Sequence, residues 1–169
     1  MANLGTALCQ SGRHSEGVVW LEKAWRAGNV GAGFNLGSIA QLQGHLNRAE
    51  AIWTEVAAAG DADAMLCLAR LALGRGDRDQ AARWIEPVLG QDDAFPVTAL
   101  GVAFRDSGDE ATAMRLFHAA IARGDPDAMD YAARVYEAAG HAGHARQLRD
   151  RAADLRTVEA NQRPPVPGS

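Results

Sequence analysis

The stretch NLGSIAQLQG, residues 35–44, decides the fold because it joins a helical spacing of apolar residues to a terminal glycine. Leu36, Ile39 and Ala40 lie three and four residues apart, which places them on one face of a helix. Gly44 follows where that helix must end, and glycine tolerates the left-handed backbone found at many helix C-termini. The same glycine recurs at a constant interval of thirty-two positions, at Gly12, Gly44, Gly76, Gly108 and Gly140. The chain is therefore predicted to contain an internal repeat.

Other columns of the sequence keep this register. Leucine or alanine stands eight residues before each glycine, at Leu4, Leu36, Leu68, Leu100 and Ala132. Small residues fill the next column, Gly5, Gly37, Ala69, Gly101 and Ala133, and the column five residues after the glycine, Gly17, Ala49, Ala81, Ala113 and Ala145. Larger apolar residues stand eight after it, at Trp20, Ile52, Trp84, Leu116 and Leu148. We expect the small residues to let two helices approach closely, and Trp84 and its equivalents to fill the core beside them.

Each unit therefore combines a helix, a glycine turn and a second helix. Such a pair cannot bury its apolar faces alone, so neighbouring pairs must stack. The sequence predicts an all-α fold, an α-solenoid of five helix–turn–helix repeats over residues 1–161, closed by a charged C-terminal capping helix. Residues 162–169 are Pro-rich and are predicted to form an extended, mobile tail. Pro87 lies inside a predicted second helix, which it should kink or shorten.

Acidic residues mark the junctions between units. The pairs are Asp61 and Asp63, Asp92 and Asp93, and Asp125 and Asp127. Paired carboxylates can perform acid–base catalysis or bind calcium, but these pairs recur where helices must begin and be capped. Prolines support these starts, because Pro126 follows Asp125 and Pro96 opens the next predicted helix. We interpret the three acidic pairs as capping residues.

Composition excludes several classes of protein. The chain has 169 residues and a net charge of −4, and its basic residues are not clustered as phosphate binding requires, so we expect no nucleic-acid partner. No apolar run is long enough for a membrane span, and the N-terminus lacks the pattern of a secretion signal. Cys9 and Cys67 have no metal-type spacing and are interpreted as free thiols of a cytoplasmic protein. Lys23 is the only lysine, a bias typical of GC-rich bacterial genomes.

The columns resemble tetratricopeptide repeats and the related Sel1-like repeats. The tripeptide NLG at 3–5 and 35–37 resembles the first-helix signature of tetratricopeptide repeats, and Ala49, Ala81 and Ala113 match a small position of that family. The junctions AAGDADA at 58–64 and ARGDPDA at 122–128 are more similar to Sel1-like units. The resemblance covers roughly residues 2–155. Each unit is two residues shorter than a usual tetratricopeptide repeat, and the loop insertion of Sel1-like units is absent.

The resemblance implies a protein-interaction module with a concave groove lined by the first helix of each unit. The groove positions are Phe34, Ser38, Gln41, Leu66, Arg70, Leu73, Thr98, Val102, Arg105, Asp130, Arg134 and Glu137. One subclass of the family holds a chaperone's C-terminal carboxylate through lysine and asparagine. Asn35 matches one such position, but Phe34, Leu66 and Thr98 stand where lysine is needed, so this function is rejected.

The groove positions include arginines from successive units. Arg70, Arg105 and Arg134 would form a row, and nearby apolar residues would anchor side chains, so we predict a protein or peptide partner with acidic and apolar residues. The alternative is that Asp130 and Glu137 neutralise these arginines. A further alternative is that the charged last helix is the docking surface.

A catalytic or metal function has little support in the sequence. His141 and His144 are three residues apart, but no third ligand lies nearby, and His14, His45 and His118 share no column. No phosphate-binding glycine loop is present, and the tryptophans occupy or adjoin core positions. We therefore predict a protein that is not an enzyme and has no cofactor and no metal.

The function predicted from the sequence is that of a protein-interaction scaffold. The alternative is a sensor or regulatory portion of a larger bacterial signalling ATPase or transcription regulator. Leu4 and Leu8 belong to the packing stripe of a first helix that has no cap residue before it. An exposed apolar end favours association, so we predict either self-association through the N-terminal repeat or a longer native chain.

Overall fold

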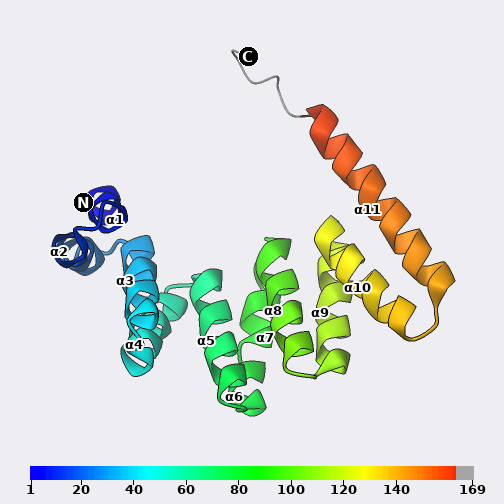
Figure 1. Cartoon of the computed structure of the whole chain (residues 1–169), viewed down its shortest axis with the longest axis horizontal. Coiled ribbons are helices and arrows are strands. Elements are labelled where there is room, and N and C mark those ends of the chain that lie inside the picture. Colours follow the sequence, from blue (N-terminus) through cyan, green and yellow to red (C-terminus); the bar gives the residue numbers. More distant parts are fainter. Residues whose placement is uncertain (163–169) are drawn as a thin grey trace. The chain divides into compact units, whose positions relative to one another are not determined.

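The computed structural model describes residues 1–162, in which the regular elements are all helices (Figure 1). They are α1 (Ala2–Gln10), α2 (His14–Arg26), α3 (Val30–Leu42), α4 (Leu46–Ala58), α5 (Ala62–Gly74), α6 (Arg78–Ala82), α7 (Ile85–Leu89), α8 (Ala94–Asp106), α9 (Glu110–Ala122), α10 (Pro126–Ala138) and α11 (Ala142–Gln162). The five repeats are α1–α2, α3–α4, α5–α6–α7, α8–α9 and α10–α11. The all-α repeat fold expected from the sequence is confirmed.

The turns follow a shorter period than the sequence analysis recognised. Glycines with positive φ angles are spaced by half of the repeat interval, and this series is interrupted only at Asp92. They are Gly12, Gly28, Gly44, Gly60, Gly76, Gly108, Gly124 and Gly140. After α3, Gly44 N–H donates to the Gln41 carbonyl and His45 N–H donates to the Ala40 carbonyl, both over 2.9 Å. This double hydrogen bond is the Schellman motif, which ends a helix at a left-handed residue. The turns within and between repeats thus share one geometry.

The first helices of four repeats begin with a side-chain cap. Asn29, Asp61, Asp93 and Asp125 are N-caps, and they occupy the same position in successive repeats. Asp61 accepts from Ala64 N–H over 2.8 Å, and Asp93 accepts from Phe95 N–H over 3.0 Å. One member of each predicted acidic pair is therefore a cap, as proposed. Asp63 and Asp127 lie in the first turns of their helices, where the helix dipole favours negative charge.

Small residues allow close packing within the repeats, as predicted. A Cβ atom added to Gly17 would lie 2.7 Å from the Gly5 carbonyl oxygen, so the backbones of α1 and α2 are nearly in contact. A Cβ on Gly37 would lie 2.4 Å from Trp53 Nε1, and one on Gly101 would lie 2.7 Å from Phe117 Cε1. Aromatic rings in these two repeats thus occupy the space that a side chain on glycine would need.

The expected position of the large core residues is corrected by one residue. Trp20, Ile52 and Trp84 are only half-buried, whereas the next column, Leu21, Trp53, Ile85 and Phe117, is buried. In the second repeat, for example, Trp53 lies four residues after the small residue Ala49 and three before the buried Val56. This spacing centres the buried column on the packed face of the helix. Leu116 is buried as well, so the expected column is correct in the fourth repeat.

Pro87 breaks the second helix of the third repeat, which confirms the prediction. Residues 78–90 occupy the place of one helix but form α6 and α7, separated by a turn at Arg83 and Trp84. Proline has no N–H and cannot donate to the carbonyl four residues earlier, which belongs to Arg83. Helical bonding resumes with Val88 N–H, which donates to the Trp84 carbonyl over 3.0 Å.

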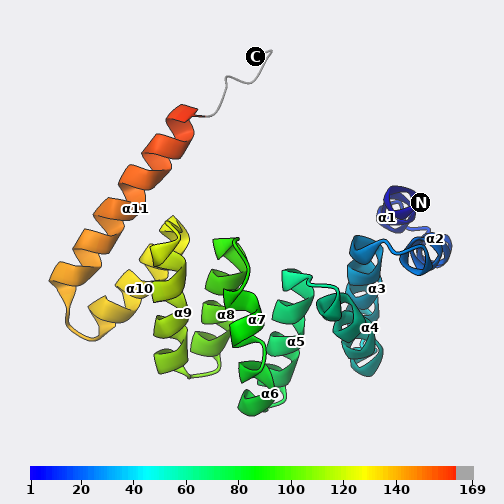
Figure 2. The ribbon, with the colours of Figure 1, turned by 180° about the vertical axis from the view of Figure 1, so that it is seen from behind.

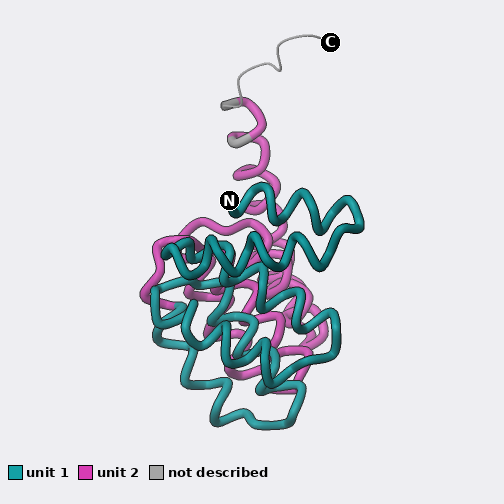
Figure 3. Tube along the Cα trace, turned by 90° about the vertical axis from the view of Figure 1, so that its left-hand side faces the viewer, with its two compact units in different colours: residues 1–88 teal, residues 89–169 magenta. Residues whose placement is uncertain are grey.

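The chain forms two compact units, one of residues 1–88 and one that begins at residue 89 (Figure 3). In the second unit, α11 runs beside α10, as both faces of the ribbon show (Figures 1 and 2). Arg156 pairs with Asp127 and Asp130, each over 2.7 Å. α11 thus covers α10, as expected of a terminal capping helix. The predicted Pro-rich tail, 162–169, lies outside the described residues except for its first position, which ends α11.

Candidate protein-binding surfaces

In the first unit, the expected groove residues occupy equivalent positions on α3 and α5. They are Phe34, Ser38 and Gln41 on α3, and Leu66, Arg70 and Leu73 on α5. Gln41 and Arg70 are exposed, and Phe34, Ser38 and Leu73 are half-buried. Leu66 is only 7% exposed and therefore offers a partner little surface. The groove residues that a partner can contact in this unit are thus fewer than expected. The accessible surface combines apolar side chains with one amide and one guanidinium.

Arg70 provides the positive charge of this surface. Within the described residues, no carboxylate lies within ion-pair distance of its guanidinium. The neighbouring Cys67 thiol is uncharged at neutral pH, because burial raises its pKa to about 11 and outweighs the opposing effect of Arg70. Asn35 donates from Nδ2 to Thr6 Oγ1 over 3.1 Å, so it joins α3 to α1.

In the second unit, two groove arginines meet at an aromatic ring that the sequence analysis did not identify. The Cζ atoms of Arg105 and Arg134 lie 5.0 Å and 5.7 Å from the centroid of the Tyr131 ring. Tyr131 stacks on Phe117, with centroids 5.6 Å apart and an interplanar angle of 14°. Tyr131 lies in the column of Asn35, three repeats later. This shared column is the sequence feature from which its place near the groove could have been predicted. The three side chains come from the first helices α8 and α10.

The alternative that Asp130 and Glu137 neutralise the groove arginines does not match their ion pairs. Asp130 pairs with Arg156, and Glu137 pairs with Arg149, so both acidic residues are engaged by α11. The hydrogen bond from Arg149 lowers the pKa of the Glu137 carboxyl. The hydrogen bonds of Arg156 to Asp127 and Asp130 raise the pKa of its guanidinium. Asp130 and Glu137 are therefore partners of the capping helix and contribute less to a groove than expected.

The remaining groove residues of the second unit differ in accessibility. Thr98 is 5% exposed and donates from Oγ1 to the carboxylate of Asp125, the N-cap of α10. Its role is thus to hold the start of α10. Val102 is half-buried, and Arg105 pairs with its neighbour Asp106 over 2.7 Å. Arg134 is exposed, and no carboxylate among the described residues lies within ion-pair distance of it. Arg105, Tyr131 and Arg134 are the side chains best placed to meet a partner.

The histidines form a contact that the sequence analysis missed. His118 shares no repeat column with the other histidines, but its Nε2 lies 3.1 Å from Tyr136 Oη, and the Tyr136 ring stacks on His144 with centroids 5.6 Å apart. The His141 and His144 rings lie 6.4 Å apart. Within residues 1–162, no group of three His, Cys, Asp or Glu side chains is arranged to hold a metal ion. These rings come from three consecutive helices: His118 from α9, Tyr136 from α10 and His144 from α11.

Comparison with known proteins identifies the fold. No protein-family model and no curated protein matches the chain in sequence. A crystal structure of MamA superimposes with a TM-score of 0.67 at 18% identity, covering 93% of this chain and 96% of MamA. A crystal structure of a Sel1 repeat protein from Oxalobacter formigenes gives a TM-score of 0.65 at 23% identity, covering 90% of this chain and 71% of that protein. The resemblance to helical repeats is thus confirmed for the fold. No helix among the described residues is both long and apolar enough to cross a membrane.

Proposed function

We propose that this chain is a protein-interaction module that binds a polypeptide segment of a partner on the exposed side chains of its first helices. The observation that carries this proposal is the arrangement of Arg105 and Arg134 around Tyr131. Arg134 is exposed, and Arg105 and Tyr131 are half-buried. Arginine and tyrosine that keep part of their surface accessible are typical of the residues that dominate binding energy in protein interfaces. The helical-repeat fold supports the proposal, since it presents a series of helix faces to a partner.

The chemistry of the side chains indicates the kind of segment. Guanidinium groups form strong charge-assisted hydrogen bonds with carboxylates, and the Tyr131 ring offers an apolar face. Arg134 forms no ion pair with another described residue, so binding a partner's carboxylate would not break an existing pair. In the first unit, Arg70 stands with Phe34 and Leu73 in the same combination of positive charge and apolar surface. We infer that the partner segment carries acidic and apolar residues. We also infer that this chain is cytoplasmic and binds its partner without acting as an enzyme.

Affinity capture followed by mass spectrometry tests this function. The wild-type chain is compared with Arg105→Glu/Arg134→Glu, with Arg70→Glu and with Tyr131→Ala. We expect the double variant to lose the partner and Tyr131→Ala to weaken capture, and wild-type capture to fall with salt because the contacts are charged. Weaker capture by Arg70→Glu would show that the first unit contributes to partner binding.

A matched control changes charges on the capping helix. Arg149 and Arg156 are unsuitable because they form ion pairs with α10. Arg146 and Arg151 are exposed on α11, so Arg146→Glu/Arg151→Glu changes the same charge without removing those pairs. If this control alone loses the partner, the first-helix surfaces are not the binding site and α11 is.

A further inference from the structure

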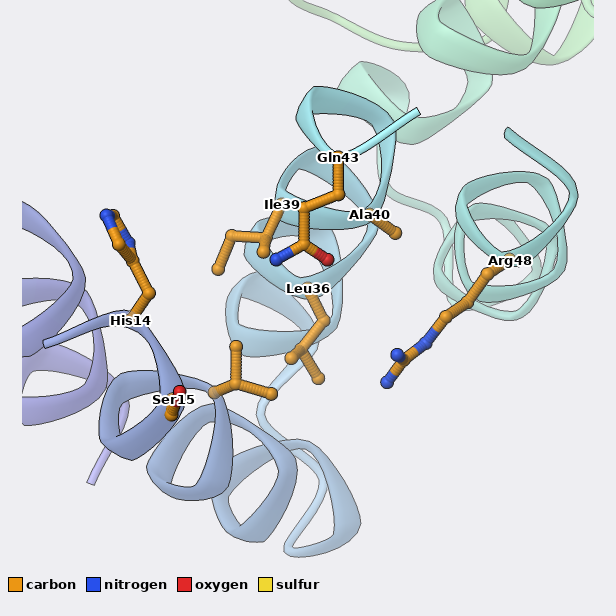
Figure 4. Close-up of a pocket in the computed structure, with 8 residues that line it drawn as sticks. His14, Ser15, Leu36, Ile39, Ala40, Gln43 and Arg48 are labelled. Carbon is orange, nitrogen blue, oxygen red and sulfur yellow. The ribbon is translucent and has the colours of Figure 1, made fainter. Parts of the chain in front are cut away.

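The first unit contains a pocket of about 330 Å³ where α2, α3 and α4 meet (Figure 4). Its apolar lining is Val18, Leu36, Ile39 and Ala40, and its polar lining is His14, Ser15, Gln43 and Arg48. Leu36 and Ala40 are buried, while the four polar residues are exposed. The pocket therefore has an apolar floor and a rim of hydrogen-bonding groups. Its volume lies at the lower end of ligand pockets, which suits a side chain better than a large cofactor.

The pocket lies on the opposite side of α3 from the proposed binding surface. Successive residues of a helix are rotated by about 100°. Phe34, Ser38 and Gln41 therefore share one face of α3, and the pocket residues Leu36, Ile39, Ala40 and Gln43 centre about half a turn away. The pocket is a separate site, and it does not depend on whether the first-helix surfaces bind a partner.

The equivalent place at the next junction is bridged by polar side chains. Val18 and Gln43 correspond to Glu50 and Arg75, one repeat later. Arg75 pairs with Glu50 over 2.6 Å, and Gln80 donates to the same carboxylate over 3.4 Å. Since valine and glutamine cannot form this bridge, the junction of α2, α3 and α4 remains open.

A different substitution fills the equivalent place in the second unit. Ala40 corresponds to Tyr136, and Arg48 corresponds to His144, each three repeats later. The Tyr136 ring stacks on His144 and contacts His118, which corresponds to Glu22. The small side chain of Ala40 is thus the second reason why the pocket exists in the first unit.

The rim of the pocket offers donors for an anionic group. Arg48 pairs with Glu22 over 3.3 Å, but the two side chains are 55% and 38% exposed, so solvent screens the pair and a ligand can exchange with it. The side chains of His14, Ser15 and Gln43 form no hydrogen bond with another described residue. A guanidinium, a hydroxyl and an amide therefore face the opening of an apolar pocket.

We propose that this pocket binds an aliphatic side chain of a partner polypeptide, with the carboxylate of an adjacent acidic residue held by Arg48. The aliphatic group would cover Leu36, Ile39 and Val18 and remove their apolar surface from water. The carboxylate would replace Glu22 at the guanidinium and accept from the Gln43 amide. The occupant is thus a Leu-Glu type of dipeptide within a segment of the partner.

NMR titration of the full ¹⁵N-labelled chain tests the site. The probe is the peptide acetyl-Gly-Leu-Glu-Gly-amide, and the matched probe has Gln in place of Glu. We expect saturable shifts of the Ile39 and Gln43 amides with the Leu-Glu peptide, and at least a fivefold weaker affinity for the Leu-Gln peptide, because it lacks the charge. Absence of saturable shifts at these amides with the Leu-Glu peptide overturns the proposal.

Variants copied from the other junctions provide the controls. Ala40→Tyr reproduces Tyr136, and Val18→Glu/Gln43→Arg reproduces the bridge of Glu50 and Arg75. Both should abolish the saturable shifts, and the surface change Arg48→Glu should weaken binding at least fivefold even if Ala40→Tyr fails to fold. Tyr136→Ala, in the second unit, should bind as the wild type does. Unchanged affinity of folded Arg48→Glu contradicts the proposed role of Arg48.

The same titration distinguishes failure of the pocket proposal from failure of the proposed binding on the first helices. Arg105→Glu/Arg134→Glu should bind the peptide normally at the pocket while losing the captured partner. Loss of peptide binding in that variant, with Arg48→Glu unaffected, would move the peptide site to the first helices.

Discussion

Helix α4 and the α6–α7 segment occupy the same place in successive repeats but differ in continuity. α4 is unbroken, whereas the α6–α7 segment is interrupted at Arg83 and Trp84. Both nevertheless bury the same three columns, Ala49, Trp53 and Val56 in α4 and Ala81, Ile85 and Val88 in α6–α7. The repeat therefore depends on the buried stripe more than on a continuous helix, since the stripe persists where helical hydrogen bonds are lost.

The largest expected effect comes from emptying the core of the unbroken repeat. Trp53→Ala should reduce the free energy of unfolding by about 3–5 kcal/mol, because the indole is fully buried and packed on Gly37. Urea denaturation followed by circular dichroism measures this. A loss below about 1 kcal/mol would contradict the assignment of Trp53 to the core.

A smaller effect is expected at Gly37, where the ring of Trp53 excludes a side chain. Gly37→Ala should cost about 1–3 kcal/mol, because its Cβ would lie 2.4 Å from Trp53 Nε1. The third repeat has Ala69 and Ile85 in these two columns. Gly37→Ala should therefore cost less in a Trp53→Ile background, which a double-mutant cycle in urea would reveal. Equal costs in the two backgrounds would show that the ring is not the obstacle.

Trp84 should tolerate truncation better than Trp53. Its side chain keeps part of its surface in water, so Trp84→Ala should cost about 1–2 kcal/mol, less than deletion of a fully buried aromatic. The measurement is the same urea titration. A cost equal to that of Trp53→Ala would contradict the placement of the Trp84 column at the edge of the buried stripe.

The smallest effect on stability is expected at the break itself. In Pro87→Ala, residue 87 gains an N–H that can donate to the Arg83 carbonyl and join α6 to α7. The unfolded chain also gains freedom, so the net change should stay within about 1 kcal/mol. Hydrogen exchange should show a protected amide at residue 87 and helical protection across Arg83 and Trp84. Rapid exchange at residue 87 would indicate that a feature other than proline maintains the break.

The parts of the fold that depend on local chemistry were predictable from the sequence. Gly44 ends α3, Asp61 caps α5 and Pro87 interrupts the second helix of the third repeat, because each acts within a few residues. The burial of Trp53 in place of the neighbouring column was not predictable, since both columns are apolar and a shift of one residue keeps the helical period.

The candidate sites were predictable only as far as the repeat register extends. The register placed Arg105 and Arg134 on neighbouring first helices, with Arg105 in the column of Leu73 and Arg134 in the column of Arg70. The pairing of Asp130 with Arg156 was missed because it depends on how α11 lies along α10. The pocket beside Ala40 was missed for a related reason. It exists because its junction lacks the larger or charged side chains that fill two other junctions, and a search for shared residues ignores such differences.

The uniform glycine turns have a consequence for how such a chain can change its length. The repeats are equal in length, and the same left-handed glycine follows each of the helices α1 to α5 and α8 to α10. Around Gly28 and Gly60, no atom lies within 4 Å of an added Cβ, so these turns are not shaped by their neighbours. Duplication or excision of a block such as 29–60 would therefore join compatible ends, and a gene of this kind can be lengthened or shortened by whole repeats through recombination.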